Sequence, residues 1–322
     1  MSLAEGKIRV GVVGLGSFGR HHARHYAANP AAIVAGFADT AVDRARAAAA
    51  EYGGSAHRDH AALIGSVDAV SVTVPTDDHY RVARDFIDAG VHVLVEKPIT
   101  GLSASARDLI ARADRAGIVL QVGHIERFSP AVVELARQSA EVRRISAVRH
   151  APPGARNAGT DVVFDLMIHD IDLAIAFAGA RIATVAASAA ADSSGVLAEA
   201  EAWLTFANGV VATLSASRVA PRHERTLTMV GTDEVWLVDL AAPGLTVFRR
   251  RGESSAPESR ALPETDKLAV EVAAFLHSVG TGAAPLVDGR AGLAALEAAE
   301  RIHAAIADEV DTALALAGAP GP

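Results

Sequence analysis

The order of apolar and polar residues divides the chain into two parts of different rhythm. Up to residue 124, short apolar segments alternate with segments in which apolar residues recur at helical spacing. This alternation is typical of βαβ units, whose parallel strands are apolar throughout because helices cover both faces of the sheet. The predicted strands cover 7–13, 32–38, 68–74, 91–95 and 118–123, and the predicted helices cover 19–28, 41–52, 78–89 and 103–116.

The second part of the chain is dominated by consecutive strands. Beyond residue 140, strand segments follow one another with only turns between them, such as the Asn-Gly pair at 208–209. Short turns between consecutive strands predict an antiparallel meander. One apolar helix around 164–172 precedes strands at 181–191, 200–207, 209–217, 225–231, 235–240 and 245–251, and helices at 266–279 and 289–307 follow them.

The composition limits the classes of function. Of the 322 residues, 50% are hydrophobic and 21% are charged, which is ordinary for a globular protein large enough for two domains. The net charge of −8 argues against a nucleic-acid binder, and no apolar run reaches the length of a membrane span. Without cysteine, disulfides and thiolate chemistry are excluded. We expect a cytoplasmic protein with neither nucleic-acid nor membrane partners.

A glycine-rich turn marks the first candidate site. Residues 14–19 read GLGSFG, with the spacing G-x-G-x-x-G, between a predicted strand and a predicted helix. In a dinucleotide-binding fold, Gly14 permits the tight turn, Gly16 lets the backbone approach the pyrophosphate, and Gly19 lets helix and strand pack closely. The motif predicts an N-terminal NAD-binding Rossmann domain over 1–124. An α+β domain with an open, mostly antiparallel sheet is predicted over 125–322.

An acid at the end of the next strand indicates which dinucleotide binds. Asp39 directly follows the predicted strand at 32–38. A carboxylate at this place accepts hydrogen bonds from the adenosine ribose and repels the 2′-phosphate of NADP. The predicted cofactor is therefore NAD. NADP is less favoured but stays open, because Arg44 and Arg46 lie close by in the sequence.

The predicted helix FDLMIHDID, residues 164–172, places acids among core-type residues. An unpaired buried carboxylate is costly, so these acids need a reason to be there. Asp165, His169 and Asp172 have the spacing i, i+4, i+7 and share one stripe of the helix. We expect this stripe to face a cleft between the domains. A metal-dependent lyase or hydrolase with these three ligands is an alternative, but it leaves GLGSFG unexplained, and no metal site is predicted.

Further motifs indicate a family. With GLGSFG and FDLMIHDID, the segments VPTDDHYRVA (74–83), VEKPIT (95–100) and VGHIERFSPAV (122–132) occur in order along the chain. In these motifs the chain resembles the Gfo/Idh/MocA oxidoreductases over nearly its whole length. The resemblance implies that Lys97 reaches the nicotinamide and the substrate, and that Asp165 and His169 face it from the second domain. The expected cofactor-binding residues are Gly14, Gly16, Ser17, Phe18, Gly19, Asp39, Pro75, Thr76, His79, Glu96 and Lys97. The expected substrate-binding residues are Arg127, Arg156 and Asp172.

The motifs are most similar to one subgroup of the family. Met167 stands where many members have glycine, and together with HIERFSP this resembles the UDP-N-acetylglucosamine 3-dehydrogenases. The resemblance implies NAD(P)-dependent hydride transfer at a secondary hydroxyl or ketone of a sugar, here C3 of a UDP-N-acetylhexosamine. A dehydrogenase of a free polyol or monosaccharide such as inositol is the alternative within the family. A non-catalytic NAD-sensing regulator is the alternative of another class, although Lys97 and His169 are both present.

The expected reaction requires a proton acceptor and a group that stabilises charge on the reacting oxygen. His169 is the best general base, because an imidazole exchanges protons near neutral pH. Lys97 suits the second role, and Asp165 orients one of the two. The Lys97–Pro98 peptide bond is expected to be cis, since the cis isomer is cheap only before proline.

Other expectations concern isolated charges and assembly. Arg149 leads into the apolar helix and meets either a diphosphate or solvent. Asp170 binds substrate hydroxyls, caps backbone groups or makes a structural hydrogen bond. His21, His22 and His25 share a helix, but no nearby acid completes a metal site. The second-domain sheet has too few helices to cover both faces. We therefore expect a homodimer or homotetramer through its exposed face, with ATLSAS and TLTMVG in the interface.

Overall fold

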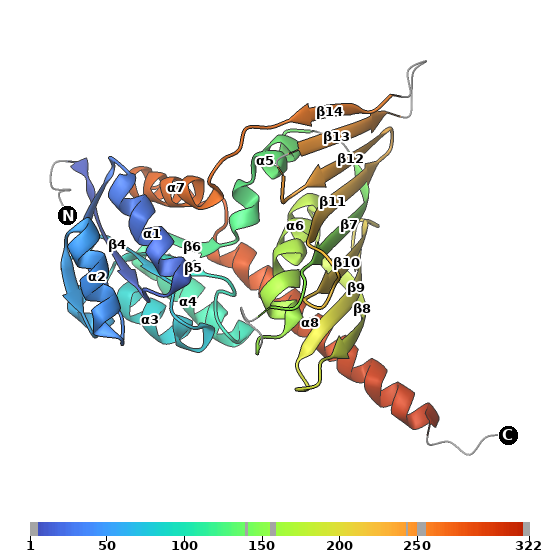
Figure 1. Ribbon diagram of the computed structural model, residues 1–322, viewed down its shortest axis with the longest axis horizontal. Helices are drawn as coiled ribbons and strands as arrows, with labels where there is room; N and C mark the ends of the chain where they lie inside the picture. The colour runs from blue at the N-terminus through green and yellow to red at the C-terminus, as the bar shows by residue number, and fades with distance from the viewer. Residues whose placement is uncertain (1–5, 139–140, 155–158, 243, 250–255, 318–322) are drawn as a thin grey trace. The chain divides into compact units, whose positions relative to one another are not determined.

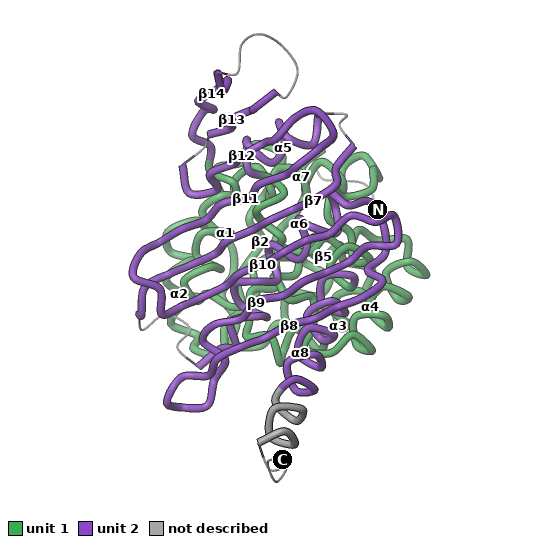
Figure 2. Tube along the Cα trace, turned by 90° about the vertical axis from the view of Figure 1, so that its right-hand side faces the viewer, with its two compact units in different colours: residues 1–128, 266–293 green, residues 129–265, 294–322 purple. Residues whose placement is uncertain are grey.

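The computed structural model describes residues 6–138, 141–154, 159–242, 244–249 and 256–317. The chain forms two compact units, which Figure 2 shows in different colours. Unit 1 comprises residues 1–128 and 266–293, and unit 2 comprises residues 129–265 and 294–322. Within the described ranges, no helix combines the length and the apolar character that crossing a bilayer requires.

Unit 1 is built on a parallel sheet. Its described residues form six strands in the order β3-β2-β1-β4-β5-β6, and every neighbouring pair is parallel. The order changes direction at β1, and dinucleotides bind at the carboxyl edge of such sheets at this point. The strands are β1 (Ile8–Val13), β2 (Ala32–Ala38), β3 (Ser55–His57), β4 (Ala69–Val72), β5 (His92–Glu96) and β6 (Leu120–Gly123). The predicted parallel sheet is confirmed.

Helices connect the strands of unit 1 and cover the sheet. They are α1 (Ser17–Ala28), α2 (Val42–Tyr52), α3 (Thr76–Asp88), α4 (Ser103–Ala116) and the short 3-10 helices η2 (His60–Leu63) and η3 (Ile125–Phe128). Helix α1 contacts α2, and α3 contacts α4. This pairing is typical of two helical layers, because right-handed crossovers place the helices of each half-sheet on one face.

A helix from the far end of the chain completes unit 1. Helix α7 (Lys267–Thr281) packs against α1 and β1, and α1 and α7 lie side by side in Figure 1. Asp266 caps its N-terminus by accepting from the backbone N–H groups of Leu268 and Ala269. Val272 and Phe275 of α7 are fully buried in the same core as Val10 and Phe37. The single predicted boundary between 124 and 125 therefore differs from the two-segment units, because the apolar face of α7 is buried on the first sheet.

Unit 2 contains an eight-stranded sheet within its described residues, in the order β14-β13-β12-β11-β7-β10-β9-β8. The β7–β10 pair is parallel and the other neighbours are antiparallel, which confirms the predicted mostly antiparallel sheet. The strands are β7 (Val142–His150), β8 (Ile182–Ala191), β9 (Leu197–Phe206), β10 (Val211–Ser217), β11 (Glu224–Gly231), β12 (Glu234–Asp239), β13 (Gly244–Arg249) and β14 (Glu258–Ala261). The central strand β7 and the edge strand β14 were not predicted.

One face of this sheet carries the core of unit 2. The segments packed in the unit are α5 (Pro130–Ala136), the π-helical turn η4 (Val163–Met167), α6 (Ile168–Ala178) and α8 (Gly289–Ala317), which begins in unit 1. In Figure 1, α6 lies against the middle of the sheet, where it contacts β7 and β10. Side chains alternate along β9, so that Leu204 and Phe206 are buried while Trp203 is 42% exposed.

Candidate active site

The glycine turn between β1 and α1 leaves no room for side chains at two positions. Gly14 has a φ of +90°, and a Cβ there would lie 2.8 Å from backbone atoms of Thr73 and Val74. A Cβ on Gly19 would collide with the carbonyl oxygen of Gly14. These two glycines therefore let β1, α1 and the end of β4 approach closely, as the motif predicts.

The third glycine has open space in front of it. A Cβ on Gly16 would meet nothing within 4 Å, and Gly16 is the N-cap residue of α1. Ser17 and Phe18 form the first turn, and the ring of Phe18 is 43% exposed. A helix N-terminus offers unpaired backbone N–H groups and a positive dipole end, which suit a phosphate. These residues fit the pyrophosphate of a dinucleotide.

Asp39 joins the end of β2 to the glycine turn. Its Oδ2 accepts from the backbone N–H of Leu15 at 2.7 Å, and its Oδ1 accepts from that of Ala41 at 2.8 Å. Each carboxylate oxygen has a further lone pair, so these bonds leave acceptor capacity for a ribose. Arg44 Nη1 lies 4.0 Å from Oδ2. The carboxylate is thus fixed at the place where the fold binds an adenosine ribose.

The ends of β4 and β5 bring the remaining predicted cofactor residues to the same edge of the sheet. Pro75 is the N-cap residue of α3 and Thr76 is its first residue. Glu96 ends β5, and Lys97 follows it. The Lys97–Pro98 peptide bond is cis, which confirms that prediction.

His79 lies beneath this edge and is almost fully buried, at 1% exposure. Its Nδ1 lies 2.8 Å from the carbonyl oxygen of Pro98, and its Nε2 lies 2.9 Å from that of Val74. Burial lowers the pKa of His79, although the two backbone carbonyls act in the opposite direction. A neutral imidazole has one N–H, so His79 donates to one of these two carbonyl oxygens and lies between the two strand ends that carry Pro75 and Lys97.

A buried polar chain lies behind Glu96. His22 Nε2 is 3.0 Å from Glu96 Oε1, and His22 Nδ1 is 3.0 Å from the Ser71 hydroxyl, which shares a 2.7 Å bond with the Tyr26 hydroxyl. Burial is the main reason that the pKa of Tyr26 lies far above its usual value. His22 therefore orients Glu96 and belongs to the interior of unit 1. Within the described part of the chain, no three histidine or acidic side chains gather closely enough to hold a metal ion.

Glu271 on α7 is a buried acid whose pKa is affected by Glu96 of this hydrogen-bonded group. It is 0% exposed, and neither carboxylate oxygen has a hydrogen-bond partner among the described residues. Burial, and secondarily the negative charge of Glu96, raise the pKa of Glu271 well above its usual value. Burial among apolar side chains therefore favours the protonated, neutral form of this carboxyl group.

The predicted catalytic pair lies in unit 2, at the start of the helical segment. Asp165 is in the π-helical turn η4, and His169 is in the first turn of α6. π-turns inside α-helices are frequent at functional sites, because they redirect side chains. Asp165 Oδ2 accepts from Nη2 of Arg218 at 3.1 Å. Arg218 follows β10 and was not predicted.

Asp170 and Arg149 form a buried ion pair. Nε and Nη2 of Arg149 donate to the two oxygens of Asp170 at 2.9 and 2.8 Å. The two residues are 3% and 1% exposed. The expectation that Arg149 meets a diphosphate or solvent is therefore wrong, and for Asp170 the structural alternative holds, because its carboxylate accepts from Arg149 inside the core. Arg149 lies on the inward face of β7, where a bidentate pair with α6 satisfies both charges.

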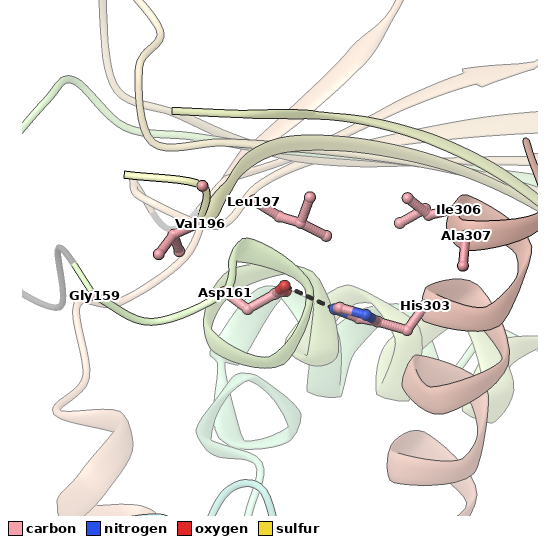
Figure 3. Close-up of a pocket in the computed structure, with 8 residues that line it drawn as sticks. Gly159, Asp161, Val196, Leu197, His303, Ile306 and Ala307 are labelled. Carbon is pink, nitrogen blue, oxygen red and sulfur yellow. Dashed lines mark hydrogen bonds and ion pairs between the residues drawn. The ribbon is translucent and has the colours of Figure 1, made fainter. Parts of the chain in front are cut away.

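A third pair holds the N-terminal end of the same helix. His303 Nε2 of α8 lies 2.7 Å from Asp161 Oδ2, and the imidazole stacks on Phe164 with ring centroids 5.1 Å apart. Asp161 also caps the backbone N–H of Val163. Figure 3 shows the pair with Val196, Leu197, Ile306 and Ala307 around it. These residues line a hollow of about 430 Å³. The bond to Asp161 raises the pKa of His303.

The predicted substrate residues lie in different elements and differ in exposure. Arg127 lies in η3 of unit 1 and is partly exposed. Asp172 is on α6 and is 1% exposed. Arg156 lies outside the described residues. Of the predicted stripe, Asp165 and His169 are thus partly exposed, while Asp172 is buried.

Comparison with known proteins places both units in one family. The model described as "Oxidoreductase family, NAD-binding Rossmann fold" matches residues 8–124. The model of the GFO/IDH/MocA C-terminal domain matches residues 139–236. A levoglucosan dehydrogenase solved in complex with NADH has the same fold, with a TM-score of 0.84 at 19% identity, covering 94% of this chain and 98% of that one.

Two enzymes of known name are similar over nearly the whole chain. UDP-N-acetylglucosamine 3-dehydrogenase of Acidithiobacillus ferrooxidans is 37% identical over 93% of this chain and 97% of its own length. Its structure superposes with a TM-score of 0.89 over 93% of this chain and 98% of that one. Inositol 2-dehydrogenase of Rhizobium meliloti is 26% identical over 96% of this chain and 99% of its own length.

Proposed function

Because the chain belongs to the Gfo/Idh/MocA family of NAD-binding oxidoreductases, we propose that it is the dehydrogenase of a nucleotide sugar. The proposed reaction is reversible oxidation of the C3 hydroxyl of a UDP-N-acetylhexosamine. The 37% identity to the UDP-N-acetylglucosamine 3-dehydrogenase, spread over 93% of the chain, carries this proposal. The identity to the inositol 2-dehydrogenase is lower, which makes a free polyol the second candidate.

In the proposed mechanism, a base removes the proton from the sugar hydroxyl and a cation stabilises the charge on its oxygen. NAD, when bound, supplies the hydride acceptor and donor. We propose that His169 takes the proton from the sugar hydroxyl, because an imidazole is a good base near neutral pH. Lys97 donates a hydrogen bond to the same oxygen and stabilises the negative charge that develops there. The Asp165 carboxylate, held by Arg218, orients and stabilises the imidazolium of His169.

The proposed preference for NAD over NADP rests on Asp39. Its carboxylate is already held by two backbone N–H groups at the end of β2, so it cannot turn away from a ribose phosphate without losing them. A 2′-phosphate placed beside this fixed negative charge is repelled.

The remaining substrate contacts are proposed for Arg127, Arg156 and Asp172. A cation that meets a diphosphate makes short, charge-assisted hydrogen bonds, which suits the two arginines. Asp172 suits sugar hydroxyls, because a carboxylate accepts several hydrogen bonds.

Substrate profiling tests the proposal. We expect NAD reduction with UDP-N-acetylglucosamine or its C4 epimer, and no comparable rate with N-acetylglucosamine or myo-inositol at equal concentration. In a thermal-shift assay with NAD present, the nucleotide sugar alone should raise the melting temperature, because a ligand that binds only the folded state stabilises it. Turnover of myo-inositol without turnover of the nucleotide sugar would establish the second candidate instead.

We also propose that the protein is a cytoplasmic homodimer or homotetramer, assembled through the outward face of the unit 2 sheet. Trp203, Leu237 and Phe248 are each at least 40% exposed on β9, β12 and β13. Ser146, Thr213 and Ser215 line a shallow hollow of about 210 Å³ beside Trp203. A broad face with exposed large apolar residues is typical of an interface between copies. A monomeric mass by light scattering at micromolar concentration would contradict this assembly.

A further inference from the structure

Arg218 contacts the carboxylate on which the proposed mechanism depends. Its Nη2 donates to Asp165 Oδ2 at 3.1 Å, and the side chains are 12% and 13% exposed. An ion pair so far removed from solvent is screened less than a surface pair, and its geometry is correspondingly more important. The guanidinium therefore restricts the direction in which the Asp165 carboxylate points.

The backbone fixes the place from which Arg218 extends. The Arg218 N–H donates to the Ala198 carbonyl of β9 at 2.9 Å, and the preceding carbonyl of Ser217 accepts from Ala151 at 2.8 Å. The Ser217 hydroxyl donates to Glu199 Oε1 at 2.8 Å. These bonds join the ends of β7, β9 and β10 around Arg218, so the arginine is held before any substrate arrives.

The three ion pairs along the helical segment have different positions. Asp170 is sealed inside the core with Arg149, and Asp161 pairs with His303 of α8 before the first helical turn. Asp165 is the member that lies one helical turn from the proposed base, His169. Arg218 can therefore affect His169 through one intermediate side chain, that of Asp165.

We infer that Arg218 is a positioning residue, which holds the Asp165 carboxylate in the orientation that stabilises protonated His169. This inference rests on the proposed function, since it requires Asp165 and His169 to serve proton transfer. When His169 takes the substrate proton, its ring gains a positive charge, and a carboxylate fixed nearby stabilises that charge without having to rotate. Without Arg218, the Asp165 carboxylate lacks this ion pair and has to adopt the required orientation anew in each turnover.

Two substitutions of Arg218 and one matched control test the inference. Arg218→Gln removes the charge, and Arg218→Lys retains it without the planar fork. Arg222→Gln is the control, because Arg222 is 81% exposed in its side chain, lies on the same connection and also pairs with a carboxylate, that of Glu224. We expect Arg218→Gln to lower kcat by about 10- to 100-fold, the usual range when a supporting group no longer fixes a catalytic one. KM for UDP-N-acetylglucosamine and Kd for NAD should stay within about twofold, and Arg218→Lys should recover part of kcat.

Combination with Asp165→Asn distinguishes the possible roles. If Arg218 acts through Asp165, Arg218→Gln should lower kcat little further in the Asp165→Asn background. Full additivity of the two effects would overturn the inference. So would a raised KM at unchanged kcat, which indicates direct binding of the substrate diphosphate, or a lowered melting temperature at unchanged kcat per folded molecule.

Failure of the proposed function gives a different pattern. If Asp165→Asn and His169→Ala both turn over normally, proton transfer does not use this pair, whatever Arg218 does. If these two variants are impaired while Arg218→Gln and Arg218→Lys match wild type, the function stands and the inference is wrong.

Discussion

The stability of the Glu271→Gln variant, relative to that of the wild type, should increase as the pH rises. Glu271 lies on the buried face of α7 between Leu268 and Phe275, and the amide of Gln121 donates to its backbone carbonyl at 3.4 Å. Burial and the charge of Glu96 hold the pKa of Glu271 well above 4.5. At pH values between the unfolded and the folded pKa, the carboxyl group therefore keeps its proton in the folded state and loses it to water on unfolding. Glutamine has the same shape and no proton to lose.

The sign and the slope of the effect follow from proton linkage. Between the unfolded and folded pKa values of Glu271, the folded state binds one more proton than the unfolded state. The contribution of Glu271 to the free energy of unfolding therefore falls by about 1.4 kcal/mol for each pH unit above the usual carboxyl pKa, until the raised folded pKa is reached. The amide has no such slope. The stability of Glu271→Gln relative to wild type should thus increase with pH, by about 3–6 °C in melting temperature per pH unit for a unit of this size.

Thermal and urea unfolding at half-unit intervals from pH 4.5 to 8 measure this difference. The comparison uses the slope alone, because the constant cost of burying an amide without a partner shifts the whole curve equally. Glu264→Gln is the matched control, since Glu264 is exposed in the segment before α7. Parallel stability curves for wild type and Glu271→Gln would refute the reasoning, because they would mean that Glu271 releases its proton in the folded state.

Three further outcomes test the site. Asp39→Ala should bring the dissociation constants of NAD and NADP, measured by titration calorimetry, closer together. Equal constants in the wild type would contradict the proposal that Asp39 selects NAD. His169→Ala should lower kcat by about 10²–10⁴, the usual worth of a general base, and Lys97→Ala by at least as much, with NAD affinity and melting temperature little changed. Arg149→Met should instead destabilise unit 2 by about 3–5 kcal/mol in urea unfolding, because it removes the cation that faces the buried Asp170 carboxylate. Wild-type stability would show that this pair is not needed for folding.

The sequence predicted the features that depend on residues close together in the chain. The glycine turn is such a feature, since Gly14 and Gly19 are required by contacts within one strand–turn–helix unit and its neighbouring strand end. Asp39 is identified by its place directly after β2, and the proline after Lys97 permits the cis bond that the structure contains. Each of these signals is read from a few consecutive residues, so no knowledge of distant packing is needed.

Features that depend on distant pairing were missed. The apolar face of α7 suits either sheet equally well in sequence, and its place in unit 1 is decided by packing against α1. Strand β7 was not predicted because arginines interrupt its apolar pattern, and one of them, Arg149, is buried only because Asp170 faces it. Arg218 has no local signal, since its partner lies 53 residues away.

The acids of the helical segment illustrate how fold and function share one set of charges. A carboxylate among core residues is tolerated when a cation or a hydrogen-bond donor faces it, and here Arg149, Arg218 and His303 come from three different elements to face three acids. The deepest pair, Arg149–Asp170, holds α6 on the sheet. The pair of Arg218 and Asp165 is less buried, and it lies one turn from His169, where a fixed negative charge favours a protonated imidazole. The same device, an ion pair between a strand end and this helix, thus serves packing at one position and the proposed proton transfer five residues earlier.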